Sequence, residues 1–324
     1  MKIGSIEAPK GQKAFGRFKT GVTHADFSVD IPLHIIHGAG DGPVLLVQAG
    51  VSGLEIEPAM SLPGLVKQLD PAQMAGTLIL VPLLNTTGFE FEQRNAIWDD
   101  KNLNALRGGR ADGSVSERMV HRYFGEVVNR ADAVLDVHTG SLSGYYRYAG
   151  VYDVGAPDRS AELARALGLP QVLLGQPADE SMAYAAAQDG KSVVSLWIGG
   201  GPGLRDYGAA DAALLRQAVL NAVRHLGMGG PAVAAPGPAS QVLKLNSIIQ
   251  TGGEPGLVFM NTGLRGQRVL AGDSLGYVRH AFTGARIRDI AAPRDGVVLH
   301  AGCVWPVVRQ TEDTTLAILG DLVE

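Results

Sequence analysis

The apolar positions of the chain fall into short continuous runs, separated by segments with a helical pattern. Four runs rich in leucine and β-branched residues predict strands over residues 43–49, 77–84, 131–138 and 191–198. Strands that are apolar throughout are typical of a sheet that is buried on both faces. Because helical segments alternate with these runs, the pattern predicts an α/β layered domain.

The clearest helical segment begins after Ser114. Its sequence offers Ser114 as the N-cap and Glu117 as the acidic residue at the third helical position. Apolar residues then recur on one helical face, namely Met119, Val120, Tyr123, Phe124, Val127 and Val128. Two further helices are predicted over residues 158–168 and 208–227, and glycines at 227, 229 and 230 end the second.

A proline- and glycine-rich segment separates two parts of different character. Beyond it, short apolar runs alternate with turn signals, which is typical of a small all-β domain. We therefore predict an α/β domain over residues 1–230, a linker over residues 231–240 and a C-terminal β domain over residues 241–324.

The composition and charge of the chain indicate which kind of molecule it binds. The 324 residues are 46% hydrophobic, so the chain can bury a sizeable core. The net charge is −4 and the basic residues are scattered, which argues against a nucleic-acid partner and favours a small molecule. No apolar run reaches the roughly 18–20 residues of a membrane span, and the N-terminus lacks the apolar core of a signal peptide. We expect a cytoplasmic protein without membrane contacts. The single cysteine, Cys303, rules out intrachain disulfides.

Polar side chains lie at or just after the ends of three predicted strands. Ser52 and Glu55 come after the first strand, Asn104 lies in the loop after the second, and Asp136 and His138 end the third. The carboxyl ends of strands are where α/β sheets place their sites. A closely spaced pair plus a distant histidine is the layout of a catalytic zinc site, although residues with this spacing alone are more often hydrogen-bonded structural groups.

Several motifs resemble one known family over nearly the whole chain. They are GVSGLE (50–55), VPLLN (81–85), the spacing of Arg94 to Asn104, GSVSER (113–118) and DVHTG (136–140). The chain resembles the succinylglutamate desuccinylase/aspartoacylase family, relatives of the zinc carboxypeptidases. The resemblance implies a zinc-carboxypeptidase-like mixed sheet flanked by helices, with a lipoyl-like barrel-sandwich β domain at the C-terminus. That domain has no lysine at the lipoyl position, so no carrier role is implied.

The resemblance also implies a zinc hydrolase that cleaves an N-acyl amide of an amino-acid-like substrate. Carried over residue by residue, Glu55 and His138 are metal ligands, and Arg94 and Asn104 bind a substrate carboxylate or carbonyl. The family's other ligand, a histidine, is replaced by Ser52, and its catalytic glutamate is replaced by Trp197. Ala105 stands where the family has a second arginine. A homo-oligomer is implied as well.

Three hypotheses follow from these substitutions. The protein is a diverged zinc amidohydrolase that has recruited another acid, with Glu57 and Glu180 as candidates. Alternatively, it is a pseudoenzyme that keeps the pocket for a carboxylate-bearing ligand. The third hypothesis is different chemistry on the same scaffold, with Ser52 as nucleophile and His138 as its base.

Overall fold

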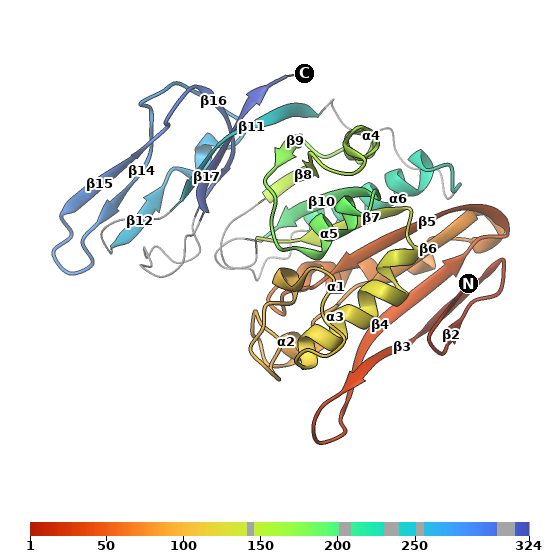
Figure 1. Ribbon diagram of the computed structural model, residues 1–324. Coiled ribbons are helices and arrows are strands. Elements are labelled where there is room, and N and C mark those ends of the chain that lie inside the picture. Colours follow the sequence, from red (N-terminus) through yellow and green to blue (C-terminus); the bar gives the residue numbers. More distant parts are fainter. Residues whose placement is uncertain (141–145, 201–208, 230–239, 251–255, 303–314, 324) are drawn as a thin grey trace.

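The computed structural model describes residues 1–140, 146–200, 209–229, 240–250, 256–302 and 315–323. Most of the predicted linker and Cys303 lie outside these residues. A large mixed sheet runs through the molecule in the order β13-β16-β17-β11-β9-β8-β10-β7-β5-β6-β4-β3 (Figure 1). Its α/β part consists of β3 (Gln12–Val22), β4 (Ser28–His37), β5 (Gly40–Ala49), β6 (Ala75–Val81), β7 (Ala133–His138), β8 (Tyr146–Tyr152), β9 (Gln171–Gln176) and β10 (Ser192–Gly199). A two-stranded ribbon, β1 (Lys2–Ile3) and β2 (Ile6–Glu7), precedes it.

The four predicted strands are confirmed as β5, β6, β7 and β10. Strand β5 pairs in parallel with β6 and β7, and β7 pairs in parallel with β10. The carboxyl ends of these strands therefore meet at one edge of the sheet. Strand β8 is antiparallel to β10, and the long β3–β4 hairpin adds two antiparallel strands on the other side.

Helices cover both faces of this sheet. They are α1 (Ile56–Ser61), α2 (Thr86–Glu90), α3 (Val115–Glu126), α4 (Pro157–Ala166), α5 (Met182–Gln188) and α6 (Ala209–His225), with 3-10 turns at Leu62–Lys67, Pro71–Gln73, Leu103–Leu106, Val128–Arg130 and Thr262–Leu264. One apolar cluster includes α4 and α6, and a second includes α3 and α5. The three predicted helices are confirmed as α3, α4 and α6, and the Ser114 backbone N–H donates to the Glu117 carboxylate at 2.8 Å.

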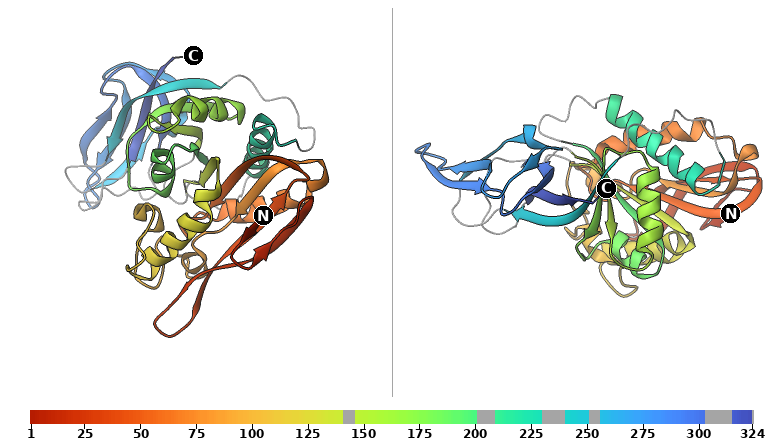
Figure 2. Two further views of the ribbon diagram at one scale, coloured as in Figure 1. Left: turned by 45° about the vertical axis from the view of Figure 1, so that its right-hand side comes forward. Right: turned by 90° about the horizontal axis from the view of Figure 1, so that it is seen from above.

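The C-terminal strands form a sandwich at one end of the main sheet (Figure 2). Strands β12 (Leu257–Met260), β14 (Ser274–Arg279) and β15 (Arg286–Ala291) make a separate three-stranded sheet. Strands β11 (Gln241–Gln250), β13 (Arg268–Val269), β16 (Gly296–Ala301) and β17 (Thr315–Leu322) belong to the large sheet. An apolar cluster includes residues from both sheets.

The large sheet is continuous between the two parts of the chain, because β11 pairs in parallel with β9 from Gln241 to Lys244. Beyond that stretch, the described part of the structure pairs β11 with β17. The division at residues 231–240 stays a prediction.

Candidate functional site

The turn after β5 carries the first two predicted site residues and is pressed against α2. An added Cβ at Gly53 would overlap the backbone of Gly88 and Phe89, so only glycine fits there. The Gly53 backbone N–H donates to the carbonyl of Arg94 at 3.4 Å. This close approach joins the turn that holds Ser52 and Glu55 to the loop that holds Arg94.

Glu55 and His138 meet at the edge of the sheet. His138 Nδ1 lies 3.1 Å from Glu55 Oε1, and its Nε2 lies 2.8 Å from Asp136 Oδ2. All three side chains are buried, with 2–7% of their surface exposed. A carboxylate oxygen therefore lies within hydrogen-bond distance of each ring nitrogen.

The charges of these groups perturb one another. Burial alone would lower the pKa of His138, but the charges of Asp136 and Glu55 outweigh it and hold this pKa well above its ordinary value. Burial alone would raise the pKa of Asp136, but the His138 charge and the hydrogen bonds that the carboxylate accepts lower it. The two carboxylates thus favour the charged form of the buried His138 ring.

A hydrogen-bonded chain extends from Asp136 into the core. Gln48 on β5 donates from Nε2 to Asp136 Oδ1 at 2.9 Å, and the Tyr123 hydroxyl on α3 donates to Gln48 Oε1 at 2.9 Å. From the sequence, Asp136 is recognisable only as a polar residue at a strand end, and Gln48 and Tyr123 are not predicted as part of a site. The only signal for Gln48 was an amide in an otherwise apolar strand.

Trp197 covers the imidazole ring. The two rings stack with centroids 4.6 Å apart and planes 25° from parallel, and Trp197 also contacts Tyr146 and Tyr148 on β8. Tyr146 in turn stacks at 4.2 Å on His300 of β16, which comes from the C-terminal strands. We call Glu55, Asp136, His138 and Trp197 the centre.

The centre offers two side chains that could bind a catalytic zinc ion, Glu55 and His138. The 3.1 Å between His138 Nδ1 and Glu55 Oε1 is near the about 3.3 Å expected for two ligands of one tetrahedral ion. The third position is Ser52, whose Oγ accepts from the Leu54 backbone N–H at 3.3 Å. A neutral serine hydroxyl is a poor zinc ligand beside imidazole.

No group of three His, Cys, Asp or Glu side chains that could hold a metal occurs in the part of the chain that the structure describes. Among the described residues, Glu55 and His138 are the two side chains placed to bind one ion, whereas a catalytic zinc ion has three protein ligands. These two side chains alone therefore do not fit a catalytic zinc ion.

The predicted substrate residues lie in the loop between β6 and α3. Arg94 is exposed, and no hydrogen-bond or ion-pair partner of its guanidinium is found among the described residues. Asn104 is half-buried, and its Oδ1 is buried without a hydrogen-bond partner. Ala105 is exposed. The backbone of Arg94 contacts the turn of the centre, but no described contact joins the Asn104 side chain to it.

The two acids predicted as substitutes differ. Glu180 is exposed and pairs with Arg107 at 3.3 Å. Glu57 is half-buried at the start of α1, and its Oε1 accepts from the Gly200 backbone N–H at 3.2 Å. Burial is the largest effect on its carboxyl and raises its pKa, against hydrogen bonds from Thr139 and Gly200. Only Glu57 therefore reaches the carboxyl ends of the central strands.

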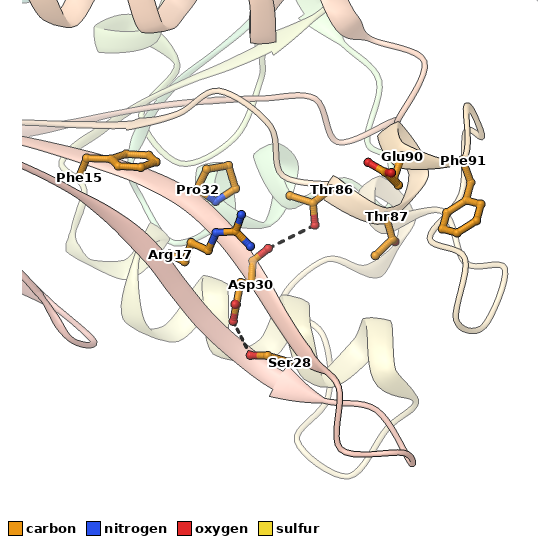
Figure 3. A pocket seen from close by; sticks show the side chains of 9 residues that line it. All are labelled: Phe15, Arg17, Ser28, Asp30, Pro32, Thr86, Thr87, Glu90 and Phe91. Carbon is orange, nitrogen blue, oxygen red and sulfur yellow. Dashed lines mark hydrogen bonds between the residues drawn. The ribbon is translucent and has the colours of Figure 1, made fainter.

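A cavity of about 380 Å³ lies between the β3–β4 hairpin and α2 (Figure 3). Inside it, the Thr86 hydroxyl donates to the Asp30 carbonyl at 3.2 Å, and the Ser28 hydroxyl donates to the Asp30 carboxylate at 2.6 Å. None of the predicted site residues lines it. Its lining residues are Phe15, Arg17, Ser28, Asp30, Pro32, Thr86, Thr87, Glu90 and Phe91.

No helix within the described residues combines the length and the apolar character that crossing a membrane requires.

Comparison with known proteins gives a consistent result. The family model for the succinylglutamate desuccinylase/aspartoacylase catalytic domain matches residues 41–226. The N-alpha-acetyl-L-2,4-diaminobutyric acid deacetylase of Halomonas elongata is 30% identical over 180 residues, which cover 54% of this chain and 52% of that protein. The chain therefore matches about half the length of this curated relative.

Solved structures share the fold. A succinylglutamate desuccinylase/aspartoacylase from Rhodobacter sphaeroides has a TM-score of 0.84 at 19% identity, over 100% of this chain and 99% of its own. The ectoine utilization protein EutE (DoeB) of Ruegeria pomeroyi, with product bound, has a TM-score of 0.83 at 24% identity, over 99% and 100%. The predicted fold class is confirmed.

Proposed function

Because the chain belongs to the succinylglutamate desuccinylase/aspartoacylase family, a family of deacylases that act on N-acyl amino acids, we propose that it binds an N-acyl-amino-acid-like ligand with a carboxylate. We propose further that it does so without zinc-dependent hydrolysis. The protein is then a binding member of a hydrolase family. We also propose that the protein is cytoplasmic and forms a homo-oligomer.

The observation that carries this proposal is the His138 ring held between two carboxylates. Glu55 and Asp136 engage both ring nitrogens, and Trp197 covers the ring face. The third ligand position beside this pair is Ser52, whose neutral hydroxyl is a poor zinc ligand. Trp197 also stands where the family has its catalytic glutamate, and an indole can neither accept nor relay a proton.

The proposed ligand class follows from the two predicted substrate residues, Arg94 and Asn104, whose side chains still have bonding capacity. Arg94 offers an exposed guanidinium, whose fork of donors matches a carboxylate. Asn104 offers a buried carbonyl oxygen that has no donor, and an amide N–H would satisfy it. The Halomonas relative is named for an N-acetylated amino acid, a ligand with both groups.

The diverged amidohydrolase remains a second candidate, and Glu57 favours it. A carboxyl with a raised pKa near the strand end is a suitable general base in the place of the missing glutamate. The serine hypothesis has less support. Both nitrogens of His138 face carboxylates, so the ring is not available as a base for Ser52.

The test combines three measurements on protein purified without chelators. Metal content is measured by mass spectrometry, binding of N-acetyl amino acids by calorimetry, and release of acetate by chromatography. We expect background zinc, saturable binding and no acetate. Stoichiometric zinc together with turnover would overturn the proposal in favour of the hydrolase.

A matched pair of arginine variants locates the binding site. Arg94→Ala should weaken binding roughly 10–100-fold, the value of a charge-assisted hydrogen bond to a carboxylate. Arg110→Ala is the control, because Arg110 is also exposed and its guanidinium pairs with Asp112 at 3.4 Å. Equal affinity in both variants would remove Arg94 from the site.

A further inference from the structure

The hairpin between β14 and β15 ends in an exposed phenylalanine. The side chain of Phe282 is 95% exposed. The turn beneath it is held by its own hydrogen bonds, since His280 Nδ1 accepts from the backbone N–H of Phe282 and of the next residue, at 3.2 Å each. The backbone N–H of His280 donates to the Ala285 carbonyl at 2.8 Å, and that of Gly284 donates to the His280 carbonyl at 3.0 Å. We call residues 280–285 the hairpin tip.

The strands that lead to the hairpin tip present cationic side chains. The Arg279 guanidinium lies over the rings of Phe259 and Tyr277, at 5.4 and 5.1 Å from their centroids. Arg286 lies over the Tyr277 ring at 4.6 Å and also pairs with Asp289. Among the described residues, Arg279 has no carboxylate partner. The apolar Phe282 side chain is therefore surrounded by positive charge.

The cavity between the β3–β4 hairpin and α2, which we call the α2 cavity, has the complementary character. Figure 3 shows Phe15 and Phe91 at its two ends, and these side chains are 63% and 55% exposed. The lining carries the carboxylates of Asp30 and Glu90 and the guanidinium of Arg17, so its net charge is −1. Its volume of about 380 Å³ is at the low end of the roughly 300–1,000 Å³ of ligand pockets. The α2 cavity therefore suits a single aromatic side chain with a cation beside it.

The hairpin tip and the α2 cavity are well separated within one chain. The tip belongs to the three-stranded sheet of the C-terminal strands, whereas β3, which borders the cavity, is the last strand at the opposite end of the large sheet. Figures 1 and 2 show the β14–β15 hairpin and the β3–β4 hairpin in different parts of the molecule. A tip that enters an α2 cavity therefore comes from a second molecule.

We propose that the hairpin tip docks into the α2 cavity of a second copy of this chain, with Phe282 between Phe15 and Phe91. The contact removes exposed aromatic surface from water on both copies, and the arginines beside the tip face Asp30 and Glu90. Because the two surfaces differ, the contact is made twice in a closed dimer or head to tail in a ring. This inference rests on the proposed homo-oligomer, names its contact, and does not depend on the ligand.

Sedimentation velocity on the full chain, over roughly 1–200 µM, tests the contact. We expect concentration-dependent association of the unmodified chain. Phe282→Ser should raise the dissociation constant at least roughly 30-fold, the value of an interface hot spot. Leu270→Ser is the control, because Leu270 is also an exposed apolar residue of the C-terminal strands, and it should leave association unchanged.

A charge reversal tests the cavity side of the same contact. Glu90→Lys brings a second cation against the arginines of the tip and should weaken association roughly 10-fold. Glu162→Lys, at an exposed position of α4, is the control and should have no effect. An equimolar mixture of Phe282→Ser and Glu90→Lys combines an intact cavity with an intact tip. The mixture should therefore associate more tightly than either variant alone.

The outcomes separate this inference from the proposed function. An unmodified chain that stays monomeric overturns both the contact and the proposed homo-oligomer. An oligomer that Phe282→Ser leaves intact retains the homo-oligomer and overturns the contact, as does a mixture that associates no better than the separate variants. Calorimetry with N-acetyl amino acids tests the ligand separately. Both substituted side chains are exposed, and circular dichroism checks that the variants fold.

Discussion

Replacing Asp136 with asparagine removes one of the two charges that hold the His138 ring and keeps the shape of the side chain. The Asp136 side chain is 2% exposed and bonds to His138 and Gln48. In the variant, the amide oxygen can still accept from Gln48. The amide nitrogen then faces the His138 Nε2–H, so that a donor meets a donor.

The size of the effect follows from the burial of the pair. Removing one partner from a buried ion pair costs about 3–5 kcal/mol. With an m-value of about 3 kcal/mol/M for urea, the unfolding midpoint should fall by about 1–1.7 M. Asp132→Asn is the control, because Asp132 is exposed and accepts one bond from the Val44 backbone N–H. It should cost about 0.5–1.5 kcal/mol.

The pH dependence has a defined sign. The folded pKa of His138 is raised above its ordinary 6.5, so its contribution is fully present below pH 6.5 and is lost as pH rises through the raised value. The folded pKa of Asp136 is lowered from 3.8, so its contribution is present above that pH and is lost as pH falls. The difference between the unmodified chain and Asp136→Asn should therefore be greatest between these two values.

Urea titrations followed by tryptophan fluorescence, repeated across pH 5–9, measure both quantities. A difference below about 1 kcal/mol that does not change with pH would refute the reasoning. It would show that the ring is not an imidazolium between two carboxylates.

Three further substitutions test separate parts of the structure. Ser52→His supplies a third zinc ligand, so the zinc content should rise from background toward one ion per chain, whereas Ser52→Ala should leave it at background. Gly53→Ala drives a methyl group into the α2 backbone and should lower the free energy of unfolding by about 1–3 kcal/mol, whereas Gly64→Ala, in open space, should change it little. The pKa of Glu117 is lowered to about 2, chiefly by the Lys101 hydrogen bond, so the stability lost in Glu117→Gln should shrink as pH falls from 4.5 toward 2.

Local sequence patterns were sufficient to predict the central strands and the main helices of the α/β part. The strands β5, β6, β7 and β10 each contain a continuous apolar run, and the serine and glutamate at the start of α3 mark its N-terminus. These features depend on neighbours in sequence, so a single chain reveals them. The β3–β4 hairpin was not predicted. Its strands alternate exposed and buried residues and carry several charges, a weaker pattern than a continuous apolar run.

The charge network of the centre was beyond sequence reasoning for a different reason. His138 lies 83 residues from Glu55 in the sequence, and Tyr123 lies 75 residues from Gln48. Which ring nitrogen faces which carboxylate depends on the strand register that puts Gln48 beside Asp136. Family motifs located Glu55 and His138, but the same motifs describe a metal site and gave no reason to expect Asp136 and Glu55 on opposite sides of the ring.

The replacements of the family's histidine by Ser52 and of its glutamate by Trp197 are consistent with each other in charge. A divalent ion would offset the negative charge of Glu55 and Asp136, and a further glutamate on β10 could be tolerated beside it. Without a third ligand at Ser52, that offset falls to the single charge of His138, and another carboxylate at the Trp197 position would stand unpaired in a buried site. An aromatic ring there removes one negative charge and attracts the imidazolium through its face.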